Sequence, residues 1–169
     1  MKTLHLVRHA KSNWDNALVE DMDRPLNDRG RLNIGELAML LKHEKARIDL
    51  LLTSPARRAF ATANAIAEAL ELDDKRFQTE PRLYMPDLES ILDVISQTEK
   101  TFTNLMIVGH EPSLSTLIGY YIPNFNAKVV TASHTKLSFQ CNSWDQVSAN
   151  NLKSAFHRNR HDWMGGSLI

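Results

Sequence analysis

Three short apolar runs in the sequence each end in side chains that could bind or transfer a phosphoryl group. Residues 4–7 are followed by Arg8 and His9, residues 50–53 by a segment containing Arg57 and Arg58, and residues 105–108 by Gly109 and His110. If these runs are neighbouring parallel strands, their carboxyl ends open on one crevice, where open α/β sheets bind their ligands. Arginine forks match phosphate oxygens and repel metal cations, so the sequence predicts a phosphoryl site there.

The residue types at these strand ends suit covalent phosphoryl transfer. An imidazole with one nitrogen bonded to a carbonyl presents the other as a nucleophile, and a second imidazole can donate a hydrogen bond to the transferring group. Arginines would neutralise charge on the phosphoryl oxygens. The alternatives are a solvated arginine pair and structural histidines. Because arginines or histidines follow all three strands, the functional interpretation is favoured.

The segment Ser54-Pro55 predicts the start of a helix, with Ser54 as N-cap and Pro55 at the first helical position. This register places Arg57 and Arg58 in the first turn. Free backbone N–H groups and the positive end of the helix dipole favour an anion at that place. The cations and the helix terminus would therefore bind the same ligand.

Strand and helix patterns alternate along the chain. Strands are expected at residues 3–7, 48–53, 77–80 and 105–109, and helices from an Asn27 N-cap to about His43, from Ser54 to about Leu70, at 88–95 and at 112–121. From Val129 onward, alternation through Leu137, Phe139, Trp144 and Val147 predicts a terminal hairpin. The order predicts an α/β fold, a three-layer α/β/α sandwich with a mostly parallel central sheet and room for an antiparallel edge, as a single domain over residues 1–169.

Composition excludes several classes of protein. Twenty basic residues balance twenty acidic ones, so no global basic field indicates nucleic acid or an anionic membrane as a partner. The single cysteine, Cys141, forms no internal disulfide, rules out a Cys-rich zinc site and fits a reducing cytosol. We see no long apolar stretch and no signal peptide, so a cytoplasmic location is expected.

Four segments of the chain resemble one known family. They are Arg8-His9-Ala10, the stretch from Asp23-Arg24-Pro25 to Gly30, Ser54-Pro55-Ala56-Arg57-Arg58-Ala59, and Gly109-His110-Glu111-Pro112. Together, in this order, they look like the histidine phosphatase superfamily, with its phosphoglycerate mutase-like fold. More narrowly, they resemble its short SixA-type phosphohistidine phosphatases.

The resemblance implies a role for each matching residue. It implies that His9 is the phosphorylated nucleophile, that His110 is the second pocket histidine, and that Arg8, Arg58 and Arg24 bind phosphate. Arg57 falls one place short of the family arginine and is expected at the surface. Neither a metal nor a cofactor is implied. His134 follows a polar stretch near the expected rim of the pocket, and its role stays open, whereas His43, His157 and His161 lie in polar contexts typical of surface histidines.

One departure from related branches bears on the substrate. Where they place a proton-donating glutamate, this chain has Tyr84; Asp87 and Glu89 are nearby, but Asp87 also fits a helix N-cap. A weak general acid suits the P–N bond of phosphohistidine, because an imidazole leaves readily. The sequence thus predicts a metal-independent phosphohistidine phosphatase acting on a phosphorylated protein.

Two rival functions stay open at this point. A phosphatase of small phosphomonoesters would use Asp87 or Glu89 as its acid, and a non-catalytic phosphate-recognising module would keep the pocket without turnover. A metal-dependent hydrolase is disfavoured, because arginines beside both histidines oppose metal binding. The physiological substrate and the oligomeric state do not follow from the sequence.

Overall fold

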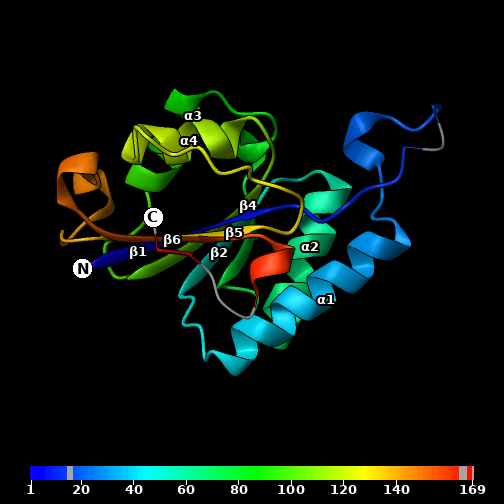
Figure 1. Ribbon diagram of the computed structural model, residues 1–169, viewed down its shortest axis with the longest axis horizontal. Coiled ribbons are helices and arrows are strands. Elements are labelled where there is room, and N and C mark those ends of the chain that lie inside the picture. The colour runs from blue at the N-terminus through cyan, green and yellow to red at the C-terminus, as the bar shows by residue number, and fades with distance from the viewer. Residues whose placement is uncertain (15–16, 164–166, 169) are drawn as a thin grey trace.

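The computed structural model describes residues 1–14, 17–163 and 167–168, which form a mixed sheet covered by helices on both faces (Figure 1). The strands are β1 (Lys2–Arg8), β2 (Leu50–Thr53), β3 (Phe77–Thr79), β4 (Asn104–Gly109), β5 (His134–Phe139), β6 (Leu152–Arg158) and β7 (Ser167–Leu168). The α-helices are α1 (Asp28–His43), α2 (Arg57–Ala69), α3 (Leu88–Ser96) and α4 (Ser113–Tyr121). Helices α1 and α2 lie on one face of the sheet and α3 and α4 on the other. The three-layer α/β prediction is confirmed.

The order of the strands decides which of their ends meet. Within the described residues the order is β3-β2-β4-β1-β5-β6-β7. The first four strands are parallel to one another, and β5, β6 and β7 each run antiparallel to the preceding neighbour. Strands β2, β4 and β1 are adjacent, so their carboxyl ends open at one edge of the sheet. Those are the three ends that carry the predicted arginines and histidines.

Two apolar cores hold the layers together. On β1, Leu4 and Leu6 face the α3/α4 core, whereas Val7 faces the α1/α2 core. On β4, Leu105 and Ile107 face the first core and Met106 and Val108 the second. A central parallel strand is buried on both faces, which is why the sequence shows a continuous apolar run at β4 rather than alternation.

The terminal hairpin differs from its prediction. Its second strand begins at Leu152, not near Trp144, which lies in a short 3-10 helix, Trp144–Gln146. The indole is almost fully buried, and its Nε1–H donates to the carbonyl of Phe102 at 2.9 Å. A large side chain with a partner for its one donor is more stable in the core than on an exposed strand, so the polar connection is longer than expected.

The starts of α1 and α2 have different capping. The Oδ1 atom of Asn27 accepts from the backbone N–H of Gly30 at 2.8 Å, which confirms the predicted N-cap of α1. Helix α2 begins at Arg57 with Ala56 as N-cap, so the predicted cap at Ser54 is wrong by two residues. The Ser54 hydroxyl lies instead 2.7 Å from His110 Nε2.

No helix in the described part of the chain is both long and apolar enough to cross a bilayer.

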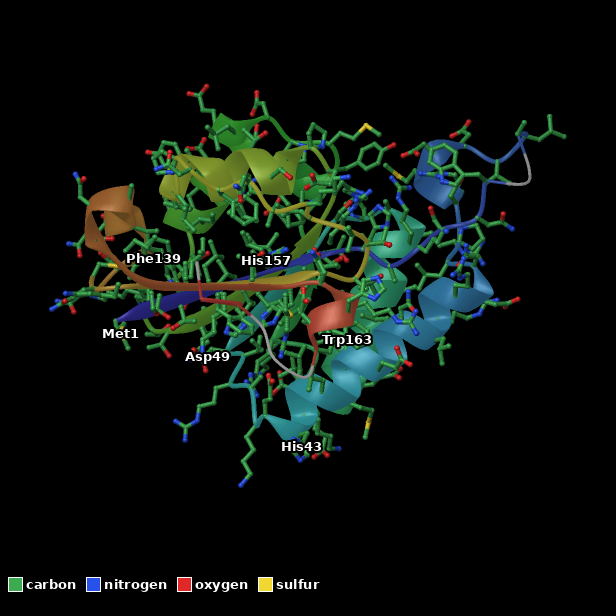
Figure 2. All side chains as sticks on the ribbon, in the orientation of Figure 1. Met1, His43, Asp49, Phe139, His157 and Trp163 are labelled. Atoms are coloured by element: carbon green, nitrogen blue, oxygen red, sulfur yellow. The ribbon has the colours of Figure 1, made fainter. Side chains whose placement is uncertain are left out.

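Side chains from distant parts of the chain complete both layers (Figure 2). Phe139 and His157 lie on the α3/α4 side of the sheet, and Trp163 packs with the α1/α2 core. The prediction that His157 lies at the surface is wrong. It is buried, with Nδ1 2.8 Å from the hydroxyl of Thr135, because its ring packs against Phe125 on the α3/α4 face of the sheet.

Candidate active site

The predicted arginines and histidines meet at the carboxyl edge of β1, β2 and β4. The ring centroids of His9 and His110 are 5.1 Å apart. The Nε of Arg58 lies 3.3 Å from His9 Nε2, and its second terminal nitrogen lies 3.4 Å from His110 Nδ1. These side chains border a cavity of about 380 Å³, lined by Arg8, His9, Lys11, Ser12, Trp14, Asp21, Arg24, Arg58, Met85, His110, Glu111 and Thr131.

Backbone contacts fix the segment that follows β1. The N–H of His9 donates to Gly109 O at 3.0 Å, and the N–H of Ala10 donates to the Thr62 hydroxyl at 3.0 Å. The start of α1 packs closely against the same segment, because a Cβ on Gly30 would lie only 2.1 Å from the carbonyl oxygen of Lys11. Only glycine permits this approach, so Gly30 lets α1 brace the loop that carries His9.

Two neighbours determine the tautomer of His9. Its Nδ1 lies 2.8 Å from the carbonyl oxygen of Ala10, which can only accept, so Nδ1 carries the proton. Arg58 can only donate, so Nε2 presents its lone pair to the guanidinium. Both contacts require the same neutral tautomer, which leaves Nε2 as a nucleophile facing the cavity cations.

His110 has the opposite tautomer for a similar reason. Its Nδ1 accepts from Arg58, and its Nε2–H donates to the Ser54 hydroxyl at 2.7 Å. Ser54 also accepts from the N–H of Ala56, so it connects the imidazole to the start of α2. A proton gained at Nδ1 would turn this nitrogen into a charged donor beside the same site.

Burial keeps both imidazoles neutral. It lowers the pKa of His9 to about 3, opposed by the hydrogen bond to Ala10 and reinforced by the charges of Arg58 and Arg8. Burial, with the charge of Arg58 next, lowers the pKa of His110 to about 4. At neutral pH each imidazole therefore keeps one unprotonated ring nitrogen, which a nucleophile requires.

The cations of the cavity outnumber its carboxylates. Four positive side chains line it (Arg8, Lys11, Arg24 and Arg58), against Asp21 and Glu111. Two buried guanidinium atoms, Arg8 Nε and Arg24 NH1, have no hydrogen-bond partner among the described residues. Arg24 also stacks over the ring of Trp14, with the guanidinium carbon 3.4 Å from the ring centroid. Buried donors with no partner are rare and indicate a site for an anion.

Asp21 is a pocket residue that the sequence analysis missed. Its carboxylate accepts from Arg58 at 2.9 Å, from Arg24 at 2.8 Å and from the Tyr84 hydroxyl at 2.9 Å. Burial opposes ionisation of this carboxyl, but the hydrogen bonds from Arg58 and Tyr84 hold its pKa below the usual range. The separation of three residues between Asp21 and Arg24 was the one local signal for the pair.

The carboxylates suggested by the sequence lie elsewhere. Asp87 is exposed and accepts from the N–H of Ser90 at 2.8 Å, so it is the N-cap of α3. Neither Asp87 nor Glu89 lines the cavity. Glu111 does, but it accepts two hydrogen bonds from Ser115. None of the three is placed as a free acid beside His9.

The remaining candidates are placed as follows. Arg57 is exposed, as predicted, and Arg58 is 3 % exposed. His134 does not line the cavity; its Nε2 lies 3.0 Å from His5 Nδ1 on the α1/α2 face of the sheet. Among the described residues, no group of three or more His, Cys, Asp and Glu side chains is arranged to hold a metal ion.

Comparison with known proteins shows the same family from sequence and from structure. Residues 4–84 match the model of the histidine phosphatase superfamily (branch 1). An uncharacterized chloroplast protein of Arabidopsis thaliana is 24% identical over 159 residues, 88% of this chain and 71% of its own. An uncharacterized protein of Mycobacterium tuberculosis is 32% identical over 111 residues, 66% of each chain.

Solved structures share the fold. The candidate phosphohistidine phosphatase SixA of Agrobacterium tumefaciens has a TM-score of 0.74 and 28% identity, over 82% of this chain and 92% of its own. A tungstate complex of the protein histidine phosphatase SixA has a TM-score of 0.73 and 19% identity, over 99% and 94%. A mycobacterial glucosyl-3-phosphoglycerate phosphatase with bound VO3 has a TM-score of 0.66 and 15% identity, over 94% and 97%. The sequence of residues 4–84 and the fold of the chain are those of the histidine phosphatase superfamily.

Proposed function

We propose that the protein is a metal-independent phosphatase that hydrolyses phosphohistidine on a protein through a covalent phosphohistidine on His9. One observation carries the proposal. The unprotonated Nε2 of His9 lies against the guanidinium of Arg58 in a cavity that also contains buried guanidinium donors without partners among the described residues. A fixed nucleophile and preorganised donors for phosphoryl oxygens are what phosphoryl transfer needs from a protein.

The proposed reaction has two steps. In the first, the lone pair on His9 Nε2 attacks phosphorus, an N–P bond forms, and the bond to the substrate imidazole breaks; that imidazole carries a proton from solvent on its other ring nitrogen and leaves as a neutral group. In the second, water attacks phosphorus, the N–P bond to His9 breaks, and phosphate leaves. Arg8, Arg24 and Arg58 would bind the phosphoryl oxygens, and His110 would donate from Nδ1 after protonation.

The polar groups beside His9 favour a substrate that needs little acid catalysis. Asp21 is held ionised by its arginine and tyrosine partners, so it carries no proton to give. The Tyr84 hydroxyl donates to Asp21, and burial together with this bond raises its pKa. General-acid help is typically worth about 10² to 10⁴-fold, so an enzyme without it selects good leaving groups, as in phosphohistidine.

The substrate class is tested by a leaving-group series. The measurement is kcat/KM at one pH for a phosphohistidine peptide, an aryl phosphate and a sugar phosphate. We expect the phosphohistidine and aryl compounds to be cleaved much faster than the sugar phosphate, and EDTA to have no effect. Equal efficiency on the sugar phosphate would transfer the assignment to small phosphomonoesters, and no turnover of any member would favour the phosphate-recognising module.

The intermediate is tested by rapid quenching at alkaline pH with labelled substrate. We expect an acid-labile phosphoenzyme in the wild type and none in His9→Ala, whose turnover should fall by roughly 10³-fold or more. His161→Ala is the matched control, because His161 is exposed and lies outside the cavity. Near-normal turnover of His9→Ala would exclude this mechanism.

A further inference from the structure

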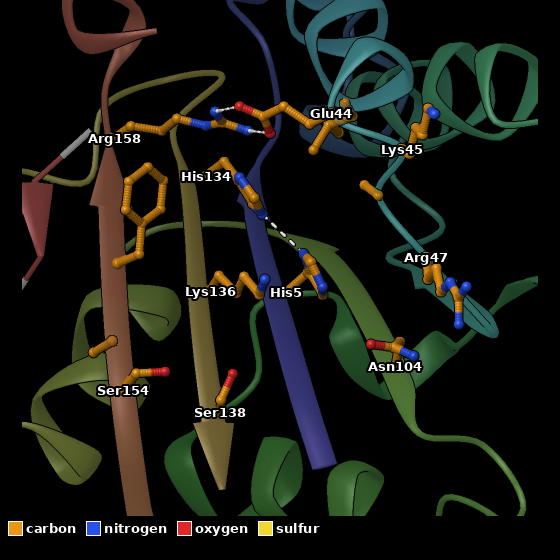
Figure 3. Close-up of a pocket in the computed structure, with 14 residues that line it drawn as sticks. His5, Glu44, Lys45, Arg47, Asn104, His134, Lys136, Ser138, Ser154 and Arg158 are labelled. Atoms are coloured by element: carbon orange, nitrogen blue, oxygen red, sulfur yellow. Dashed lines mark hydrogen bonds and ion pairs between the residues drawn. The ribbon is translucent and has the colours of Figure 1, made fainter. Parts of the chain in front are cut away.

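A second cavity lies on the α1/α2 face of the sheet, where β1, β5 and β6 pass the end of α1 (Figure 3). We call it the β5–β6 groove and define it by His5, His134, Lys136, Phe156 and Arg158. Its volume is about 580 Å³, within the range of small-molecule sites, and it shares no lining residue with the His9 cavity. The function proposed above therefore makes no use of it.

The polar floor of the groove follows from strand alternation. On β5, Lys136 and Ser138 face the groove, whereas Leu137 and Phe139 face the α3/α4 core. On β6, Ser154 lines it. These strands lie beyond β1, where the apolar core under α1 gives way to a hydrophilic surface.

Positive charge is concentrated in the groove. The chain has a formal net charge of zero, yet the lining holds four cations and one carboxylate: Lys45, Arg47, Lys136, Arg158 and Glu44. Both carboxylate oxygens of Glu44 accept hydrogen bonds from the guanidinium of Arg158, at 2.6 and 2.8 Å, so this carboxylate already neutralises one of the four cations. Within the described residues, the other three cations form no ion pair. The local excess of charge would be balanced better by an anion with two or more charges than by a single carboxylate.

A buried histidine pair lies at the floor of the groove. His5 Nδ1 is 3.0 Å from His134 Nε2, the ring planes are 7° apart, and the side chains are 4 % and 3 % exposed. One proton lies between the two rings. The outer Nδ1 of His134 has no partner among the described residues, and the same is true of Arg158 Nε. A buried polar atom without a partner in the lining of a cavity indicates a missing ligand group.

The surroundings of the pair decide which ligand group fits. Burial lowers the pKa of His5 to about 3 and that of His134 well below its usual value, and the charges of Lys136 and Arg158 contribute to both shifts. The pair is therefore neutral, with those two cations close to it. An anion in the groove would select the tautomer in which His5 Nδ1–H donates to His134 Nε2, because the outer Nδ1 of His134 then carries a proton and donates to the anion. A donor among cations is suited to an oxyanion.

We propose that the β5–β6 groove is a second anion site, which binds a small phosphorylated molecule through the ammonium of Lys136 and the Nδ1–H of His134. Lys45 and Arg47, at the outer edge, supply the charge for a second phosphate or carboxylate. Ser138 and Ser154 offer neutral hydrogen bonds, and the half-buried ring of Phe156 offers an apolar surface. The site is distinct from the reaction centre and takes its ligand without cleaving it.

The test uses methylenediphosphonate, whose P–C–P bonds a phosphatase does not cleave, as the probe. Binding to the full chain is followed by NMR of the histidine ring nitrogens, because His5 and His134 report the groove and His9 and His110 report the other cavity. We expect the His5 and His134 signals to shift with a saturable dependence on probe concentration. Ring signals of this pair that stay unchanged up to about 10 mM probe would overturn the proposal.

Charge reversal at Lys136 locates the site. Lys136→Glu should weaken the groove binding at least about tenfold and leave phosphatase activity unchanged, since Lys136 is exposed and lies outside the His9 cavity. Lys153→Glu is the matched control, because Lys153 is an exposed residue of β6 that does not line the groove. Arg58→Ala should weaken only the binding reported by His9. Equal weakening by Lys136→Glu and Lys153→Glu, or loss of the groove signal in Arg58→Ala, would contradict the proposal.

Discussion

Replacement of Arg58 by alanine tests the geometry of the candidate active site most directly. The guanidinium is buried, donates to His9 Nε2 and His110 Nδ1, and pairs with Asp21. Its loss removes one preorganised donor, which typically costs about 10² to 10³-fold in kcat, or roughly 2.7 to 4 kcal/mol of transition-state stabilisation. Asp21 keeps its bonds to Arg24 and Tyr84, so the fold should survive the change.

Arg57 provides the matched control. It precedes Arg58 in the same turn of α2 but is exposed, so Arg57→Ala should change kcat less than about twofold and stability by less than about 0.5 kcal/mol. Arg58→Lys keeps the charge without the planar fork, and its kcat should lie between those of the wild type and Arg58→Ala. The assay is kcat on an aryl phosphate, with circular dichroism to verify folding.

The pKa values of the histidines give a second readout of the same change. The charge of Arg58 lowers the pKa of both His9 and His110, so Arg58→Ala should raise both pKa values in an NMR titration. A merely structural arginine would leave them in place. Equal losses of kcat in Arg57→Ala and Arg58→Ala, with unchanged histidine titrations, would refute the arrangement described here.

Three further predictions concern stability. Gly30→Ala should destabilise the fold by about 2 kcal/mol and lower kcat, because the added methyl collides with backbone two residues after His9; Gly35→Ala, with open space around its position, should stabilise by about 0.5 to 1 kcal/mol in urea unfolding. Since the folded-state pKa values of His9 and His110 are depressed to about 3 and about 4, and those of His5 and His134 are depressed as well, the unfolded chain takes up the protons of these four side chains first as pH falls. The free energy of unfolding should then decrease below about pH 6.5, by up to about 1.4 kcal/mol per pH unit for each; a flat profile between pH 7 and 5 would contradict their neutral burial. Asp87→Ala should lower the unfolding midpoint through loss of the α3 cap while kcat stays unchanged, and a large loss of kcat would restore Asp87 as a candidate acid.

Local patterns in the sequence were sufficient to predict the layers of the fold and the strand ends that form the cavity. The buried runs of β1, β2 and β4 are apolar because both faces of a central sheet are covered, and each run is followed by the residues that the site brings together. The Asn27 cap follows from side-chain chemistry within three residues. Such signals act over one turn or one strand, so they are visible without tertiary contacts.

Contacts between distant segments decided the rest. Ser54 was expected to cap α2, but its hydroxyl contacts His110, which follows β4 and lies 56 residues later in the chain. Asp21 reaches Arg58 and Tyr84 from an irregular segment, where no periodic pattern shows which way a side chain points. His5 and His134 meet because β1 pairs with β5 in one register, and that register depends on which faces of the two strands are buried together. A polar side chain is placed by the partners that the whole fold brings within reach, and those partners are not encoded in its neighbours along the chain.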